Sequence, residues 1–312
     1  MIVAGIPVRI RQSAALVGAV AVAAWASGAA AAPTVPLAKV AIGPQSGLLL
    51  AAGGSLWTSD LVLGQVVRVD PATNRITRKI AFGARPFGMA YGAGSLWVAD
   101  RSGSTVARIN PRTNRVVKRI TIGLGSYNMT FGAGSAWVGC ELDGKLYRIS
   151  ASKNRVTATI KIGGHPNGVL YAFGSIWVAN LGSAVVRVDP STNRVTQRIA
   201  VPRADWITPS ADSLWVSAET NRVTRIDPVK GAVTASIAVG ANPVGSAWVN
   251  DSLWVPNLDG GTVSVIDPAT NAIRKTLEVG SGPLAVATAA GDVWLSNSND
   301  GELWRLDRRE GE

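Results

Sequence analysis

The sequence predicts an all-β fold, a seven-bladed β-propeller with four antiparallel strands in each blade and a last blade closed by the N-terminal strand. The first observation is a tryptophan that recurs every 38 to 40 residues within similar segments such as Gly-Ser-Leu-Trp-Val-Ala-Asp. A repeat of about 40 residues built from short strands is typical of propeller blades. The recurring residues are Trp57, Trp97, Trp137, Trp177, Trp215, Trp254 and Trp294. We expect them to pack between blades.

The second observation is the pattern inside one unit, residues 83–122, where four strand-like segments alternate with turns. The predicted strands cover residues 89–91, 95–100, 105–110 and 115–122. Residues 105–110 alternate apolar and polar side chains, as a half-buried strand does. The turns carry Gly, Pro and Asn, and the repeated Asp-Pro-x-Thr-Asn segments at Asp70, Asp189 and Asp267 are interpreted as turns and not as metal sites.

The third observation concerns the two ends of the repeat. The seventh unit has no fourth strand, because the chain ends at Glu312 soon after the segment 302–307. A surplus strand-like segment, residues 37–42, precedes the first unit and matches residues 77–82 one period later. We therefore expect residues 37–42 to complete the last blade beside 302–307, which leaves few exposed sheet edges. The propeller domain is predicted to cover residues 32–312.

Residues 1–31 resemble a signal peptide. Arg9 and Arg11 precede an apolar run at 14–24, and Ala29-Ala30-Ala31 provides small residues for cleavage. We expect a bacterial periplasmic or secreted protein with no transmembrane segment after signal cleavage. Cys140 is the only cysteine, so no disulfide forms within the chain.

The chain is basic, with 31 Lys and Arg against 20 Asp and Glu and a net charge of +11. Several arginines recur where the outer strands begin, and charge there discourages pairing between sheet edges. These are Arg75, Arg115, Arg155 and Arg194. No stacking aromatic residues alternate with a basic stripe, so nucleic acid is not expected as a partner. We expect a monomer.

Several segments resemble the repeats of known propeller families. Residues 263–271, Val-Ser-Val-Ile-Asp-Pro-Ala-Thr-Asn, resemble the YVTN-type bacterial propeller repeat, and residues 95–97 and 188–193 are similar to repeats of the streptogramin (virginiamycin B) lyase family. The resemblance covers residues 35–310 and implies a propeller. That family opens a cyclic depsipeptide by elimination, with a histidine base and magnesium-binding carboxylates.

The sequence departs from the lyase pattern at the residues that this chemistry requires. The loop positions that correspond to the histidine are Gly47, Phe87, Tyr127, Asn167, Asp205, Val244 and Leu284. The strand-end positions that correspond to the glutamate are Asp60, Asp100, Cys140, Asn180, Ala218, Asn257 and Asn297. Neither set contains the expected residue, so no catalytic residue is predicted.

The same two sets of positions are predicted to lie on one face of the ring, around the central channel. Concave sites of this kind usually hold ligands. The candidate ligand-binding residues are Asp60, Arg85, Asp100, Tyr127, Asn167, Asn180, Asp205, Trp206, Asn257 and Asn297. Trp206 falls outside the tryptophan repeat and is either a ligand platform or a core residue. The alternative for the whole set is a wet polar channel mouth without a specific ligand.

A separate hypothesis concerns the only thiol and the only imidazole of the chain. Cys140 and Glu141 end one predicted strand, and His165 leads into the next unit. These residue types bind soft metals or form an activated thiolate. The alternative is that each is merely packed or solvated.

Two main functions remain open. The first is a binding or interaction module that recognises a protein, a peptide or an envelope component through its channel face, without a cofactor. The second is a lyase-like or lactonase-like enzyme that uses a divalent ion such as Mg or Ca. An oxidoreductase of the quinone type fits less well, because the chain has no recognisable cofactor motif.

Overall fold

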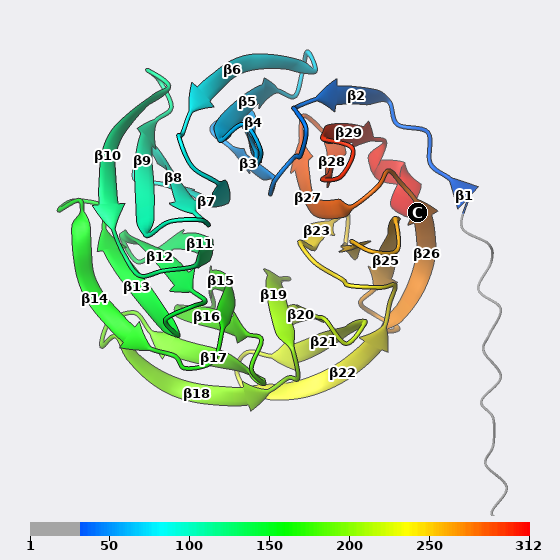
Figure 1. Cartoon of the computed structure of the whole chain (residues 1–312). Helices are drawn as coiled ribbons and strands as arrows, with labels where there is room; N and C mark the ends of the chain where they lie inside the picture. The colour runs from blue at the N-terminus through cyan, green and yellow to red at the C-terminus, as the bar shows by residue number, and fades with distance from the viewer. Residues whose placement is uncertain (1–31) are drawn as a thin grey trace, which may run out of the picture. The chain divides into compact units, whose positions relative to one another are not determined.

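The computed structural model describes residues 32–312, which form a ring of seven antiparallel sheets (Figure 1). The leader predicted for residues 1–31 lies outside the described residues. The inner strands surround the centre of the ring, and the long outer strands form its rim (Figure 1). The predicted seven-bladed propeller is therefore confirmed.

Blades 1 to 6 each contain four consecutive strands, numbered from the inside outward in chain order, and blade 7 takes its outer strand from the N-terminal segment. Blade 1 has β3 (Leu50–Ala52), β4 (Ser55–Asp60), β5 (Gln65–Asp70) and β6 (Arg75–Ala81). Blade 2 has β7 (Pro86–Gly92), β8 (Ser95–Asp100), β9 (Thr105–Asn110) and β10 (Arg115–Thr121). Blade 3 has β11 (Ser126–Gly132), β12 (Ser135–Cys140), β13 (Lys145–Ser150) and β14 (Arg155–Lys161). Blade 4 has β15 (Pro166–Ala172), β16 (Ser175–Asn180), β17 (Ala184–Asp189) and β18 (Arg194–Ala200).

The remaining blades show where the repeat is modified. Blade 5 has β19 (Ala204–Pro209), β20 (Leu214–Ala218), β21 (Arg222–Asp227) and β22 (Ala232–Ala238). Blade 6 has β23 (Ala247–Val249), β24 (Ser252–Asn257), β25 (Thr262–Asp267) and β26 (Ala272–Glu278). Blade 7 has β27 (Pro283–Ala289), β28 (Asp292–Asn297) and β29 (Glu302–Leu306), with its outer strand supplied by β2 (Ala38–Ala41).

The N-terminal strand closes the ring as the sequence predicts. In the antiparallel pair of β2 and β29, Ala38 lies opposite Arg305 and Ala41 lies opposite Glu302. The short strand β1 (Ala32–Pro33) pairs in parallel with β26 at the outer edge of blade 6. The N-terminal segment thus joins blades 6 and 7: β2 is the outer strand of blade 7, and β1 pairs with the last two residues of β26 in blade 6.

The seven repeat tryptophans are buried between neighbouring sheets, each with at most 1% of its surface exposed. In five of them the indole N–H donates to the backbone carbonyl five residues earlier, as Trp97 does to Gly92. Burial of these rings supplies much of the apolar contact between blades. The predicted packing role is confirmed.

A repeated arginine on the third strand ties each of six blades to the next. Arg108 stacks over Trp97 at 5.0 Å from the ring centroid and donates to Ser95 of its own blade. It also donates to Ala151 and Asn154 in the following blade, at 2.8 and 2.7 Å. The equivalent stacked residues are Arg68, Arg148, Arg187, Arg225 and Arg305. Cation–π contacts and charge-assisted hydrogen bonds therefore supplement the apolar seams.

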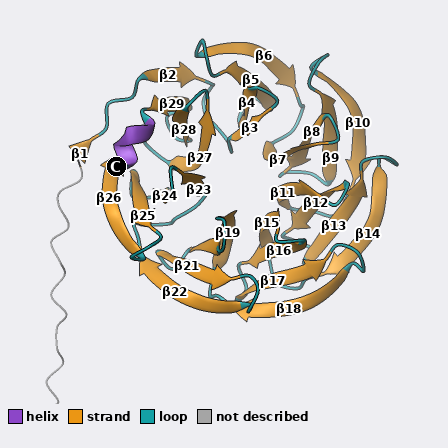
Figure 2. Ribbon diagram, turned by 180° about the vertical axis from the view of Figure 1, so that it is seen from behind, coloured by secondary structure: helices purple, strands orange, loops and turns teal. Residues whose placement is uncertain are grey.

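Blade 6 is the exception, because Val265 lies opposite Trp254 where the other blades have arginine. The 3-10 helix η1 (Arg308–Gly311) packs there instead, and Gly311 lies against the Trp254 ring so closely that a β-carbon would clash. Figure 2 shows η1 in purple at this end of the chain. Within residues 32–312 no helix has the length and apolar character needed to span a membrane.

Candidate functional site

The inner strands begin at the crossover loops, which lead from the outer strand of one blade into the next blade. Glycine lets adjacent inner strands approach closely here. A β-carbon on Gly88 would lie 2.3 Å from the Tyr127 carbonyl oxygen, and one on Gly168 would lie 2.5 Å from the Asp205 carbonyl oxygen. The residue before each glycine, Phe87 or Asn167, is therefore held beside its counterpart in the next blade. This spacing narrows one end of the channel, which we call the mouth.

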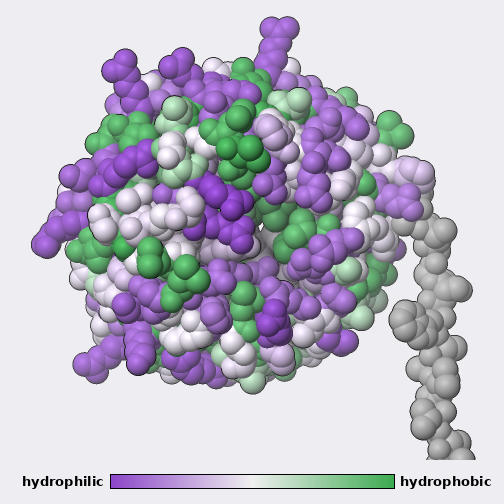
Figure 3. Space-filling view, viewed as in Figure 1, coloured by the Kyte–Doolittle hydropathy of each residue, from purple (hydrophilic) through white to green (hydrophobic). Residues whose placement is uncertain are grey.

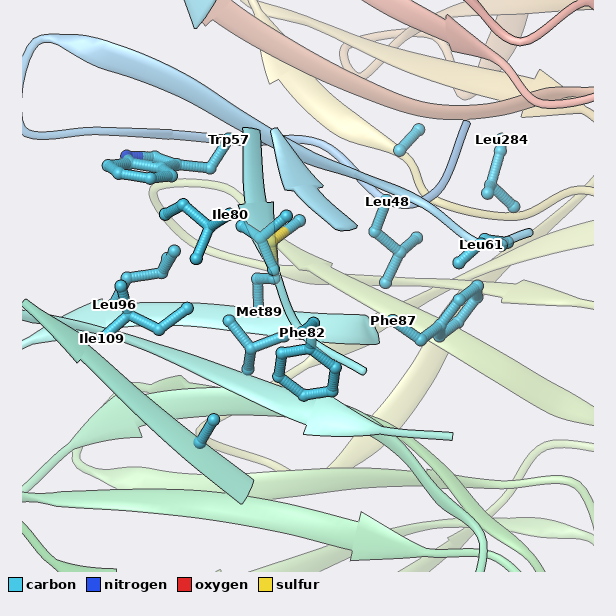
Figure 4. Packing of buried hydrophobic residues seen from close by; sticks show 14 of the residues in the cluster. Leu48, Trp57, Leu61, Ile80, Phe82, Phe87, Met89, Leu96, Ile109 and Leu284 are labelled. Carbon is cyan, nitrogen blue, oxygen red and sulfur yellow. The ribbon is translucent and has the colours of Figure 1, made fainter. Parts of the chain in front are cut away.

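One half of the mouth is apolar. Leu48, Phe87, Val244 and Leu284 are buried in a single hydrophobic cluster with Leu61, although they come from four different blades. Figure 4 shows Leu48, Leu61, Phe87 and Leu284 at one end of this cluster. Side chains from opposite sides of the ring thus fill part of the channel.

The other half of the mouth is polar and comes from blades 3, 4 and 5. Asn167 and Asp205 are 3% and 5% exposed, and Nδ2 of Asn167 donates a short hydrogen bond to Oδ1 of Asp205. Oδ1 of Asn167 is buried and has no hydrogen-bond partner among the described residues. Buried polar atoms are normally paired, so this free acceptor points to a missing partner.

An arginine outside the channel covers the aromatic side chains of the mouth. The Arg101 guanidinium lies 4.8 Å from the Phe87 ring centroid and 4.6 Å from that of Tyr127. The two rings are 4.7 Å apart and tilted by 56°. Arg101 itself is exposed in the turn after β8, and its backbone N–H donates to the Arg85 carbonyl. We call Phe87, Arg101, Tyr127, Glu141, Asn167 and Asp205 the mouth cluster.

Burial sets the protonation chemistry of this cluster. Burial raises the pKa of Asp205 from its ordinary value of 3.8 to about 6, and Glu141 adds to the rise, while the Asn167 hydrogen bond and Arg101 oppose it. Burial, with Asp205 and Glu141, also raises the pKa of the Tyr127 phenol, against the effect of Arg101. Tyr127 therefore keeps its proton at neutral pH, and Asp205 exchanges its proton near physiological pH.

A cavity of about 290 Å³ lies in the channel beyond the mouth. Most of its lining residues are apolar, but its walls are mixed in polarity, with Asn128 and Thr130 among the residues that supply polar groups. The lining comes from the inner strands β3, β7, β11, β15 and β19 and the residues before β3: Leu48, Leu49, Leu50, Met89, Ala90, Tyr91, Asn128, Met129, Thr130, Phe131, Val169, Leu170, Trp206 and Ile207. Trp206 lines this cavity and follows Asp205 of the mouth cluster in the chain. It is half-buried. A concave site lined by apolar side chains with some polar groups among them is typical of small-molecule sites.

The strand-end candidates lie beside the mouth, on the face that the sequence predicts, since Asp100 lies opposite Pro86 and Asn180 lies opposite Pro166 across their sheets. Each is buried at the end of a second strand, and most hydrogen-bond to nearby turns. Asp60 accepts from the amides of residues 62 and 63, Asp100 from Ser102, and Asn180 from His165 and Gly182.

Asn257 and Asn297 occupy the same position in blades 6 and 7. Asn257 donates to Thr262 and Ser264, while Asn297 has no side-chain partner among the described residues. The structure therefore places Tyr127, Asn167, Asp205 and Trp206 at the mouth and the channel cavity. The strand-end residues lie at the adjacent ends of the second strands, and the carbonyl of the exposed Arg85 accepts from the backbone N–H of Arg101.

Cys140 and His165 do not have the arrangement that a shared metal or thiolate site requires. Cys140 is fully buried, its Sγ contacts the Gly123 carbonyl, and burial raises its pKa to about 12. His165 is exposed in the crossover loop before β15. Residues 32–312 contain no group of three or more His, Cys, Asp or Glu side chains placed to hold a metal ion. The described residues, Cys140, Glu141 and His165 included, therefore do not assemble a site for a divalent metal ion.

The molecular surface around the centre of the ring is mixed in character. Figure 3 shows hydrophilic and hydrophobic residues side by side around the central depression. Phe87 and Arg101 were not among the candidates from the sequence. The clue to Phe87 is its place in the Pro-x-Gly segment shared with Asn167, whereas Arg101 lies in a hairpin turn that has no repeated signature.

Comparison with known proteins supports the fold alone. The sequence matches no protein-family model and no curated protein. A chain of the Kuenenia stuttgartiensis hydrazine synthase is similar in structure, with a TM-score of 0.75, 15% identity, and 91% of this chain and 99% of that chain covered. A streptogramin B lyase is also similar, with a TM-score of 0.75, 14% identity, and coverage of 86% and 96%. The fold expected from the lyase resemblance is therefore confirmed, and two enzymes of different names share it.

Proposed function

We propose that this β-propeller is a binding module whose ligand occupies the central channel. The polar end of the ligand lies at the mouth cluster, and its apolar part lies in the channel cavity. The observation that carries the proposal is the unpartnered Asn167 oxygen beside the buried Asp205 carboxylate. Trp206 joins this polar pair to an apolar cavity of about 290 Å³.

The energetics support a binding role for these residues. A buried carboxyl group without an ion pair lowers the stability of the folded protein when it is ionised. Such residues are frequent at functional sites, where their side chains serve a ligand rather than the fold. Strand-end residues beside the mouth also keep buried polar atoms without a partner among the described residues, namely Oδ2 of Asp60, Oδ1 of Asn257 and both polar atoms of the Asn297 side chain.

The expected biological setting follows from the sequence. The signal peptide predicted at residues 1–31 is the basis for placing the protein in the periplasm or outside the cell. We propose a monomer that recognises part of a protein, a peptide or an envelope component, because only a single side chain or a small molecule fits the channel cavity.

Ligand-observed NMR with 2-phenylethanol tests this function. The aromatic ring matches the apolar cavity, and the hydroxyl donates to the mouth. We expect saturable binding that weakens at least tenfold in Trp206→Ala and changes less than twofold in Trp248→Ala. Trp248 is a matched control, since it is half-buried, lies outside the tryptophan repeat and does not line the cavity. Absence of binding, or equal binding by both variants, would contradict the proposal.

A second candidate is an enzyme in which Asp205 acts as a general base. Its pKa of about 6 suits proton transfer at neutral pH, and it lies beside a cavity. Elimination of the lyase kind needs such a base. Incubation of a cyclic depsipeptide with the protein, followed by mass spectrometry, tests this candidate; an activity lost in Asp205→Asn would favour it over simple binding.

A further inference from the structure

Two buried acceptor groups of the mouth cluster lie side by side. The Asp205 carboxylate forms no salt bridge within residues 32–312. Oδ1 of the neighbouring Asn167 has no hydrogen-bond partner there. Acceptors that converge in a buried place require a ligand that donates hydrogen bonds.

The aromatic residues of the cluster already hold a cation. The Arg101 guanidinium lies over Phe87 and Tyr127 and affects the titration of both Tyr127 and Asp205. Cation–π contact between a guanidinium or ammonium group and such rings is favourable. Arg101 is exposed, and displacement of its side chain would leave the same rings open to another cation.

We infer that the mouth cluster binds an organic cation, a primary ammonium or guanidinium group, held by Asp205 and the Asn167 oxygen against the Tyr127 ring. The apolar chain that carries this group enters the channel cavity. The inference rests on the proposed binding function and specifies the ligand class. The whole protein has a net charge of +11 and repels cations in general, so saturable cation binding has to come from a local site.

Isothermal titration with three probes of the same shape tests the charge preference. The probes are phenethylammonium, 2-phenylethanol and phenylacetate, each titrated into the full-length protein at pH 7.5. We expect phenethylammonium to bind at least tenfold more tightly than phenylacetate. In Asp205→Asn its affinity falls at least tenfold, while the affinity for the alcohol changes less than twofold. Asp259→Asn is the control, because Asp259 is an exposed acid on a β24–β25 turn without a salt bridge.

Arg101→Ala separates a cation site from an anion site. If Arg101 occupies the aromatic rings in place of the ligand, its removal strengthens phenethylammonium binding by about threefold or more. If Arg101 instead recruits an anion, the same variant weakens phenylacetate binding, which overturns the inference. The variant removes an exposed side chain, so folding is expected to be unaffected.

The outcomes distinguish the inference from the function on which it rests. Binding of the alcohol with no preference for ammonium overturns the cation class and leaves the binding function standing. Absence of binding by all three probes overturns both. A fourth probe, a capped Ala-Lys-Ala peptide, distinguishes two sources of the cation. A higher affinity for the peptide than for phenethylammonium identifies a polypeptide lysine as the source. A lower affinity identifies a small amine.

Discussion

Replacement of Asp205 by asparagine is expected to stabilise the folded protein at neutral pH. The side chain is 5% exposed and forms no salt bridge with any residue of the described ring, and burial raises its pKa from 3.8 to about 6. The folded state therefore holds the Asp205 proton more tightly than the unfolded state does. The stability that this proton contributes is present below pH 3.8 and is lost as the pH rises through about 6.

The magnitude follows from the change in pKa. One pKa unit corresponds to about 1.4 kcal/mol, so ionisation of Asp205 lowers the free energy of unfolding by about 3 kcal/mol at pH 7.5. Asparagine has nearly the same shape, keeps an oxygen for the Asn167 amide and carries no charge. We expect Asp205→Asn to be more stable than the wild type by about 3 kcal/mol at pH 7.5, and by about 5–10 °C in melting temperature.

Urea unfolding of both proteins between pH 4 and pH 8 measures this difference. When the free energy of unfolding of the wild type is subtracted from that of the variant, the contributions of the other titrating groups cancel. We expect it to be close to zero near pH 4 and to grow through pH 6. A variant that is less stable than the wild type at pH 7.5, or a difference that does not change with pH, would refute the reasoning that Asp205 is buried and unpaired.

Three further predictions concern the scaffold. Ile42→Ala, at a site 1% exposed beside the closing strand, should lower the free energy of unfolding by about 2–5 kcal/mol, while the exposed control Val35→Ala should change it by less than ~0.5 kcal/mol. Arg108→Ala removes a stacked and hydrogen-bonded link between blades 2 and 3 and should lower the free energy of unfolding by about 2–4 kcal/mol, as measured by chemical unfolding. Arg115→Ala, at an exposed strand start, is its control. Equal effects of the two substitutions would count against the link. Cys140, with its thiol pKa raised to about 12, should react with a disulfide reagent at pH 8 only after unfolding, and rapid reaction of the native protein would disagree with its burial.

The sequence predicts the scaffold well because its pattern is periodic. The recurring tryptophans and the alternation in segments such as 105–110 determine which side chains enter the seams, and the surplus strand at 37–42 determines how the ring closes. The links made by arginine, such as Arg108, also recur in the sequence, but their role depends on contacts between blades that no local pattern reveals. The replacement of arginine by Val265 in blade 6 is compensated by the end of the chain, which only the structure shows.

The mouth cluster was predictable only in part. Asn167 and Asp205 follow from their equivalent positions in the repeat, but the pairing of Arg101 with Tyr127 depends on a turn from a neighbouring blade. Strand-end residues such as Asp60 share a face with the mouth, as the sequence predicts. The sequence did not show that the Asp60 side chain also accepts hydrogen bonds from adjacent turn amides, as short polar residues readily do.

The carboxyl carbon of Asp205, observed by NMR with ¹³C-labelled aspartate and assigned by its absence in Asp205→Asn, gives the most direct test of the proposed site. A titration without ligand should show a pKa of about 6, and saturating phenethylammonium should lower it, because a bound cation stabilises the ionised carboxylate. A pKa close to 3.8 that does not move when the amine is added would contradict both the burial of this residue and its role as the receptor for a cation.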